Sequence, residues 1–343
     1  MSDESHHEKE LGGKLLASVS RSFYLTLKAL PRELREPISL AYLLARTADT
    51  IADTAQIPAA TRLDCLTRFD VLVQNDGRDD EAEQSLARVL SADFCPHQTD
   101  EAEATLMQRF ADSLAWLGTM QGAARGHIRS VLKTIIHGQK LDIQRFPGDE
   151  ELRSLQTRAE LDDYTYLVAG CVGEFWTRLC FTELAGAFPP GVPLEQACAW
   201  GIGFGKGLQL VNILRDLGKD ARLGRCYLPQ EQWQPLGLTL AQIKADPATL
   251  RPVWADWMVT CEAHLQDGLR YVQQVRHGKL RYATALPLLL AARTVALMKK
   301  AGDEELKAGV KVSRLEVAGI LAKATWNHTP KGVEQQFLAL SKV

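Results

Sequence analysis

The sequence predicts an all-α protein, and three observations support this fold class. Residues 11–30 and 60–74 each read as a helix, and residues 104–146 are helical by the period of their apolar residues. Residues 41–54 and 208–229 carry polar side chains at helical spacing among apolar neighbours. The glycines of residues 201–207 alternate, but no predicted strand precedes them, so they do not indicate a dinucleotide-binding fold.

The composition argues against several classes of protein. The chain has 343 residues, 46% of them hydrophobic, and a formal net charge of −2, so we expect a substantial core and no nucleic-acid partner. Its seven cysteines lack zinc-site spacing and are expected to be reduced core residues. The N-terminus is polar rather than signal-like, and no run of about 20 apolar residues predicts a transmembrane helix. We therefore expect a cytoplasmic protein.

Residues 41–54 predict a helix with one polar stripe. Tyr42, Arg46, Asp49 and Asp53 follow one another at steps of four, three and four, which places them on one face at about 100° per residue. Apolar residues surround this face. Pro58 limits how far the helix can run, so the two aspartates lie near its C-terminal end.

Residues 208–229 repeat this arrangement. Gln209, Asn212, Asp216 and Asp220 fall at steps of three, four and four on a helix that is predicted to span residues 194–222. Gly224 is expected at or just past the helix end. Carboxylates near a helix C-terminus are disfavoured by roughly 0.3–1 kcal/mol each, and a bound cation would reverse this penalty.

The two stripes together indicate a magnesium-dependent enzyme. One acidic stripe could be an ordinary solvated helix face, but two matching stripes with an arginine near each are harder to explain that way. Oxygen-only ligands suit Mg²⁺, which commonly completes its coordination with water and phosphate. We predict that Asp49, Asp53, Asp216 and Asp220 bind Mg²⁺ and that the substrate carries a polyphosphate group.

These stretches resemble the two aspartate-rich motifs of the squalene/phytoene synthase family. The matching segments are DTIAD at residues 49–53, NILRDLGKD at 212–220 and the GRCYLP that follows. The resemblance implies a single-domain helical bundle of the isoprenoid synthase type around a central hydrophobic cavity. This domain would span residues 11–325, between a disordered tail at 1–10 and a C-terminal tail helix at 326–343.

The resemblance also implies residues that bind the diphosphate. Arg46, Arg215 and Arg225 would add positive charge at the departing diphosphate. The SRSF element of the family, which lies at the diphosphate site, matches Ser20, Arg21, Ser22 and Phe23. The other residues of the two stripes and of the R-x-Y/F-x-P motif that are expected to bind substrate are Tyr42, Gln209, Asn212 and Tyr227.

Two further assignments follow from the resemblance. Tyr164 matches the tyrosine implicated in the first half-reaction and would relay a proton, although the residues alone favour a core tyrosine. Residues 309–314 resemble a basic loop, in which Lys311 and Arg314 could bind a diphosphate or the phosphate of a nicotinamide cofactor. Solvated charges are the alternative there.

The reaction implied is the head-to-head condensation of two farnesyl diphosphates through presqualene diphosphate to squalene, with Mg²⁺ and NADPH. Release of dehydrosqualene or phytoene, or a presqualene and hydroxysqualene route without reduction, stays open. So do a head-to-tail elongase or terpene cyclase and a catalytically silent helical assembly factor. Because the product would be a lipid, we also expect peripheral contact with a membrane.

Overall fold

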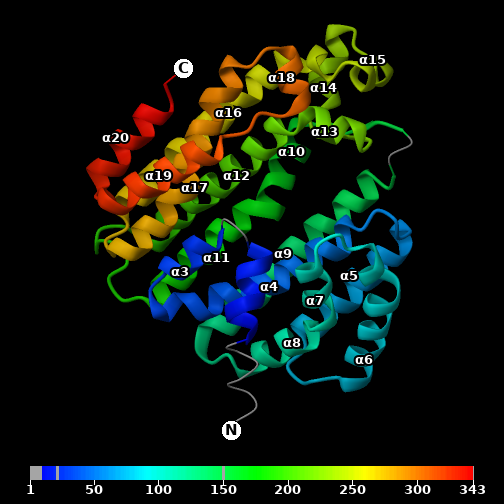
Figure 1. Ribbon diagram of the computed structural model, residues 1–343, viewed down its shortest axis with the longest axis vertical. Coiled ribbons are helices and arrows are strands. Elements are labelled where there is room, and N and C mark those ends of the chain that lie inside the picture. Colours follow the sequence, from blue (N-terminus) through cyan, green and yellow to red (C-terminus); the bar gives the residue numbers. More distant parts are fainter. Residues whose placement is uncertain (1–9, 21–22, 149–150, 343) are drawn as a thin grey trace. The chain divides into compact units, whose positions relative to one another are not determined.

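The computed structural model describes residues 10–20, 23–148 and 151–342, and it is almost entirely helical (Figure 1). The strands within this part of the chain are β1 Arg153–Ser154 and β2 Arg225–Cys226, which pair in parallel. The all-α prediction is therefore confirmed. Nearly all of the predicted tail at 1–10 lies outside the described residues.

The chain divides into two compact units. The first unit comprises Met1–Gln144 and Arg178–Ala185, and the second comprises Arg145–Thr177 and Gly186–Val343. Two of the boundaries fall within the helices Gly122–Arg145 and Cys171–Glu183, and the third follows Ala185, outside a helix. The predicted central cavity and the domain boundaries at residues 10 and 325 stay predictions.

The first unit is a succession of helices. Their bounds are η1 Leu11–Leu15, α2 Leu16–Ser20, α3 Phe23–Ala29, α4 Arg32–Asp53, α5 Ala59–Gln74, α6 Asp80–Val89, η2 Leu90–Phe94, η3 Cys95–His97, α7 Glu101–Gln108, α8 Phe110–Thr119 and α9 Gly122–Arg145. The predicted helix over residues 60–74 is confirmed as α5. Of the helix predicted over residues 11–30, the described residues form η1, α2 and α3.

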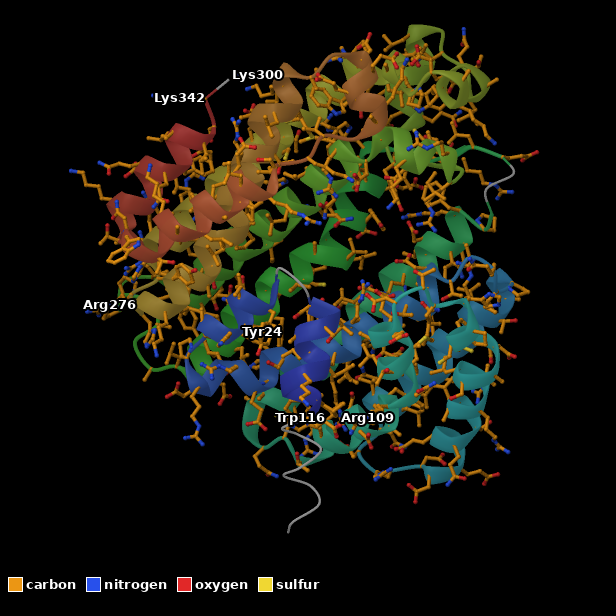
Figure 2. The ribbon with its side chains drawn as sticks, in the orientation of Figure 1. Tyr24, Arg109, Trp116, Arg276, Lys300 and Lys342 are labelled. Carbon is orange, nitrogen blue, oxygen red and sulfur yellow. The ribbon has the colours of Figure 1, made fainter. Side chains whose placement is uncertain are left out.

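The helix α4 packs against α5, α7 and α8 in the first unit (Figure 1). Its apolar face includes Leu43 and Leu44, which are completely buried. Trp116 on α8, labelled in Figure 2, donates its indole N–H to Glu36 Oε1 at 3.0 Å and so ties α8 to the N-terminal part of α4. The helix ends at Asp53, so the two aspartates lie near its C-terminal end, as predicted. This packing fixes the direction of the polar face of α4.

The second unit contains β1, β2 and most of the longer helices, and the helix Cys171–Glu183 passes into the first unit after Thr177. Its helices are α10 Arg158–Thr165, η4 Tyr166–Gly170, α11 Cys171–Glu183, α12 Leu194–Arg215, α13 Leu217–Arg222, α14 Gln230–Trp233, η5 Gln234–Leu236, α15 Leu240–Ala245, η6 Pro247–Leu250, α16 Arg251–Gln274, α17 Gly278–Lys300, α18 Asp303–Ala308, α19 Arg314–Trp326 and α20 Pro330–Leu340. The helices α12, α16 and α17 lie side by side (Figure 1). The C-terminal helix α20 packs on α16 and α17.

The glycines of α12 allow its close packing against η4 and α11. A Cβ atom on Gly173 would lie 1.9 Å from the carbonyl oxygen of Gly201, and a Cβ on Gly205 would lie 2.3 Å from that of Ala169. Any side chain at these positions would force the backbones apart. The alternating glycines of α12 therefore allow close packing at Gly201 and Gly205.

The helix that carries the second pair of aspartates is interrupted at Asp216. This residue ends α12 and precedes α13, with φ −97° and ψ 14°. Two residues later, α13 approaches α18 so closely that a Cβ on Gly218 would lie 2.1 Å from the carbonyl oxygen of Lys307. The prediction of one continuous helix over residues 194–222 is therefore wrong at one residue. Gly224, with φ +73°, lies just past α13 as predicted.

One helix of the second unit meets the length and composition expected of a membrane span. It is α17, and 67% of its most apolar window is buried inside the structure. We expected no segment long and apolar enough to span a membrane. By length and composition, α17 shows that this expectation is wrong. A buried core helix meets the same criteria, and α17 packs against α12, α16, α19 and α20.

Candidate functional site

The first acidic stripe consists of Asp49 and Asp53 on α4. Because α4 is continuous, Tyr42, Arg46 and the two aspartates share one helix face, as their spacing predicted. Asp49 is half-buried, whereas Asp53 is exposed at the end of the helix. The stripe therefore runs from the interior of the first unit towards its surface.

Asp49 lies where a negative charge is costly. Burial raises the pKa of its carboxyl to about 7, and the neighbouring charge of Asp53 acts in the same direction. The guanidinium of Arg46 and a hydrogen bond from the amide of Gln139 oppose this shift. A divalent cation beside Asp49 would stabilise its ionised form, so this donor fits a metal ligand.

Arg46 is held by a residue that the sequence analysis missed. Its Nη2 donates to Oε1 of Glu103 on α7, and the Glu103 side chain is 17% exposed. A polar hollow of about 230 Å³ adjoins this pair and is also lined by Thr50, Asp53 and His97. Glu103 lies in an acidic stretch that looks like a solvated helix end, so nothing in its sequence neighbourhood indicates this contact.

The SRSF element is described only in part. Ser20 is buried at the end of α2, and its Oγ donates to the Leu16 carbonyl at 2.5 Å. Arg21 and Ser22 lie outside the described residues, and Phe23 begins α3. Next to Ser20 in the chain, the Val19 carbonyl accepts a 3.1 Å hydrogen bond from the hydroxyl of Tyr42. This bond connects α4 to the start of the predicted element.

The second acidic stripe consists of Asp216 and Asp220. Arg215 forms a two-pronged bond with its neighbour, from Nε to Asp216 Oδ1 at 2.9 Å and from Nη2 to Oδ2 at 2.7 Å. This bond to Asp216 is also the main cause of the raised pKa of the Arg215 guanidinium. Asp220 follows one turn later on α13, where its N–H donates to the Asp216 carbonyl at 2.8 Å.

The preceding turns of α12 carry the other predicted residues of this stripe. Gln209 is half-buried and Asn212 is exposed. The Asn212 carbonyl accepts from the Asp216 N–H at 2.9 Å, which continues the helical bonding up to the break. Trp254 on α16 donates its indole N–H to the Leu214 carbonyl at 2.9 Å, so α16 supports the helix end that presents the stripe.

The predicted basic loop begins beside the second acidic stripe. A Cβ on Gly309 would lie 3.5 Å from the Arg215 carbonyl oxygen and 3.9 Å from Asp216 Oδ1. Gly309 has φ +84°, a conformation that favours glycine. Lys311 and Arg314 follow in this loop and at the start of α19, and both are exposed. The fold therefore brings two segments together that are about 90 residues apart in the chain.

Tyr164 and Tyr227, predicted separately, lie against each other. Their rings are stacked with centroids 4.9 Å apart, and their hydroxyl oxygens are 3.4 Å apart. Phe146 packs edge-on against Tyr227 at 5.2 Å. Arg225, two residues before Tyr227, is half-buried in β2, where Arg153 N–H donates to the Gly224 carbonyl at 2.9 Å. The short sheet thus anchors the R-x-Y-x-P segment beside Tyr164.

Neither stripe forms a complete metal site on its own. Within the ranges that the structure describes, no three Asp, Glu, His or Cys side chains gather closely enough to hold a metal ion. Further ligands would have to come from elsewhere, such as substrate oxygens and water. The stripes belong to different units, and their pairing around shared ions stays a prediction.

Comparisons with known proteins agree on one family. The model of the squalene/phytoene synthase family matches residues 16–316. A squalene synthase of Gibberella zeae is 25% identical over 324 residues, which cover 92% of this chain and 63% of that protein. A bifunctional lycopene cyclase/phytoene synthase of Phaeosphaeria nodorum is 28% identical over 235 residues, covering 68% of this chain and 36% of that protein.

A solved structure of TcSQS in complex with a ligand is similar to this chain, with a TM-score of 0.76 at 21% identity. The alignment covers 98% of this chain and 90% of that one. This likeness confirms the predicted isoprenoid synthase-type fold. This chain spans 63% and 36% of the lengths of the two sequence relatives named above.

Proposed function

Because the chain belongs to the squalene/phytoene synthase family, we propose that it is a farnesyl-diphosphate farnesyltransferase that forms squalene. It would join two farnesyl diphosphates head to head through presqualene diphosphate and reduce the product with NADPH. One observation carries the proposal: two acidic stripes, each with an arginine nearby, occur in the order expected for this family. Squalene synthases are prominent among its relatives.

The four aspartates of the stripes supply a donor set that fits Mg²⁺. All donors are carboxylate oxygens, and Asp49 is positioned where a nearby cation would offset the cost of its charge. Mg²⁺, when bound, neutralises the diphosphate oxygens and acts as a Lewis acid for the leaving group. Asp49 and Asp53 would hold it from α4, and Asp216 and Asp220 from α12 and α13.

The arginines of the chain orient and stabilise the departing diphosphate. Arg215 is prepositioned by its bidentate bond to Asp216, and Arg46 by its bond to Glu103. Preorganised cations of this kind stabilise developing negative charge without reorganising during the reaction. Arg225 lies two residues before Tyr227, which stacks on Tyr164, and it would bind the same diphosphate.

Tyr164 is suited to move the proton that is lost when the cyclopropane of presqualene diphosphate closes. Its hydroxyl lies in a buried aromatic environment formed with Tyr227 and Phe146. Such surroundings exclude water, which would otherwise quench the carbocation. The hydroxyl of Tyr227 lies 3.4 Å away and can pass the proton on.

The basic loop at residues 309–314 is our candidate for binding the phosphate of NADPH. Its first residue, Gly309, lies beside Arg215 and Asp216. The exposed side chains of Lys311 and Arg314 offer two cations from this loop. Hydride transfer from the cofactor would then convert the rearranged cation to squalene.

A second candidate function is the synthesis of dehydrosqualene or phytoene, in which proton loss replaces hydride transfer. The similarity to a bifunctional lycopene cyclase/phytoene synthase supports it. This reaction would use the same stripes and the same tyrosine but would not require the loop at 309–314 to bind a cofactor.

One incubation separates these functions. The purified protein is given farnesyl diphosphate and Mg²⁺, with and without NADPH, and the hydrocarbon is identified by mass. We expect squalene only when NADPH is present. Dehydrosqualene in both reactions would support the alternative, as would phytoene from geranylgeranyl diphosphate. If no pyrophosphate is released from either substrate, the chain is not this enzyme and the silent assembly factor becomes the better account.

A further inference from the structure

Gln139 on α9 connects to the first acidic stripe and takes no part in the mechanism above. Its side chain is 7% exposed. Its amide Nε2 donates a hydrogen bond to Oδ1 of Asp49 on α4. Because an ionised carboxylate only accepts hydrogen bonds, the amide turns its nitrogen towards the Asp49 carboxylate and its oxygen away from it.

The other end of this amide is unsatisfied. Among the described residues, Gln139 Oε1 has no hydrogen-bond partner and is shielded from solvent. A buried acceptor without a partner destabilises the folded state. Arg46 Nε, a donor on the same face of α4, is also buried without a partner in this part of the chain. Gln139 Oε1 and Arg46 Nε could therefore form hydrogen bonds with a ligand that offers a donor and an acceptor.

We infer that Gln139 is an outer-sphere ligand of the metal at the first acidic stripe. Its Nε2 orients Asp49, and its Oε1 accepts a hydrogen bond from a water of the hydrated divalent cation. Mg²⁺ keeps several of its waters when it is held by few carboxylates. Groups that contact a metal through its ligands commonly set its affinity, and their loss costs about 10–100-fold. This inference rests on the proposed metal site at Asp49.

A second glutamine shows what a purely structural role looks like. Gln336 on α20, in the second unit, is 2% exposed and also has a buried Oε1 without a partner among the described residues. Its Nε2, however, donates to backbone carbonyls, Asn327 O at 2.9 Å and Gly332 O at 3.3 Å. It stabilises the turn before α20 and contacts no predicted ligand. Gln336 is therefore a matched control for Gln139.

The test measures binding rather than turnover. Mn²⁺ is titrated into the full-length protein in the presence of inorganic pyrophosphate, and bound Mn²⁺ is followed by electron paramagnetic resonance. The variants are Gln139→Met, which keeps the volume but removes both polar groups, Gln139→Glu, which keeps acceptor oxygens but loses the donor, and Gln336→Met. Thermal unfolding of each variant checks that it is folded.

We expect Gln139→Met to weaken Mn²⁺ binding about 10–100-fold, Gln139→Glu to recover at least part of this loss, and Gln336→Met to bind as the wild type does. The inference is overturned if folded Gln139→Met binds Mn²⁺ normally, or if Gln139→Glu binds no better than Gln139→Met. The probe contains no prenyl chain. Failure of the squalene reaction would therefore leave this result interpretable on its own.

Discussion

The two acidic stripes have the same sequence pattern but different electrostatic surroundings. On α4, Arg46 precedes Asp49 by three residues and is engaged by Glu103, while Asp49 accepts a bond from the neutral amide of Gln139. At the end of α12, Arg215 adjoins Asp216 and binds it through two nitrogen atoms. The second stripe is thus partly neutralised within the protein, whereas the first depends more on a bound cation.

This difference shows what an arginine near an aspartate pair in sequence does and does not imply. Burial raises the pKa of Asp49 to about 7 although Arg46 is one turn away. The position of the guanidinium, and not its presence in the motif, decides how much charge it offsets.

Replacing one aspartate in each stripe should abolish turnover in both cases but change stability in opposite directions. Asp49→Asn and Asp216→Asn should each lower turnover at least about 1000-fold, because each loses several kcal/mol of leaving-group stabilisation. Without metal at pH 8, Asp49→Asn should unfold at a higher temperature than the wild type, since it removes a buried charge. Asp216→Asn should unfold at a lower temperature, since it breaks the Arg215 pair.

Circular dichroism and thermal unfolding of both variants check this pair of predictions. Asp64→Asn, at an exposed position on α5, is the control and should match the wild type in turnover and stability. Equal changes of the unfolding temperature in Asp49→Asn and Asp216→Asn would contradict the difference between the two stripes. Normal turnover in either variant would show that the replaced aspartate is not part of the catalytic site.

Tyr164→Phe should reduce turnover about 100-fold, within the range of general acid–base catalysis. The stacked ring and its packing on Tyr227 would be retained, so stability should change little. Tyr271→Phe is the matched control, because Tyr271 is also buried in the second unit and its hydroxyl accepts a hydrogen bond from Thr177 Oγ1 at 3.1 Å. Similar losses of activity in both variants would indicate a structural rather than a proton-transfer role for Tyr164.

Glu103→Gln tests how the first stripe uses its arginine. The variant keeps the shape of the side chain but weakens its bond to Arg46, and we expect kcat/KM to fall about 10-fold. Glu101→Gln, an exposed change on the same helix, should have no effect. A gain in activity would mean that Glu103 competes with substrate for Arg46 instead of positioning it.

The smallest predicted effect is the pH dependence of stability. The folded pKa of Asp49 lies above its unfolded value, near 4, so between these values the folded state binds more protons than the unfolded state. The metal-free protein should therefore lose stability from this group as pH rises from about 4 to 7. Added Mg²⁺ should raise the unfolding temperature more at pH 8 than at pH 5.5, and Asp49→Asn should reduce this difference.

Much of the fold could be predicted from the sequence because helical spacing is a local property. The place of the first aspartate pair near the C-terminal end of α4 and the glycine after α13 follow from neighbouring residues. The break at Asp216 could not be predicted in this way, since it accompanies a contact between Gly218 and Lys307, which are far apart in the chain. The same holds for the close approach of Gly173 to Gly201.

The candidate site shows the same division. The stripes were visible because their residues recur at helical spacing on one element. Glu103 and Gln139 were missed because they reach α4 from α7 and α9, and each looks ordinary in its own helix. The stacking of Tyr164 on Tyr227 brings together two motifs that the sequence identified but could not connect.

The central claim is that the two stripes bind one magnesium diphosphate together. The most direct test titrates farnesyl thiodiphosphate, an analogue that resists ionisation, into the wild type, Asp49→Asn, Asp216→Asn and the double variant, with and without Mg²⁺. We predict that each single variant loses the Mg²⁺-dependent part of binding and that the double variant is no weaker than either. Independent, additive losses, or a single variant that keeps its full Mg²⁺ dependence, would contradict the claim.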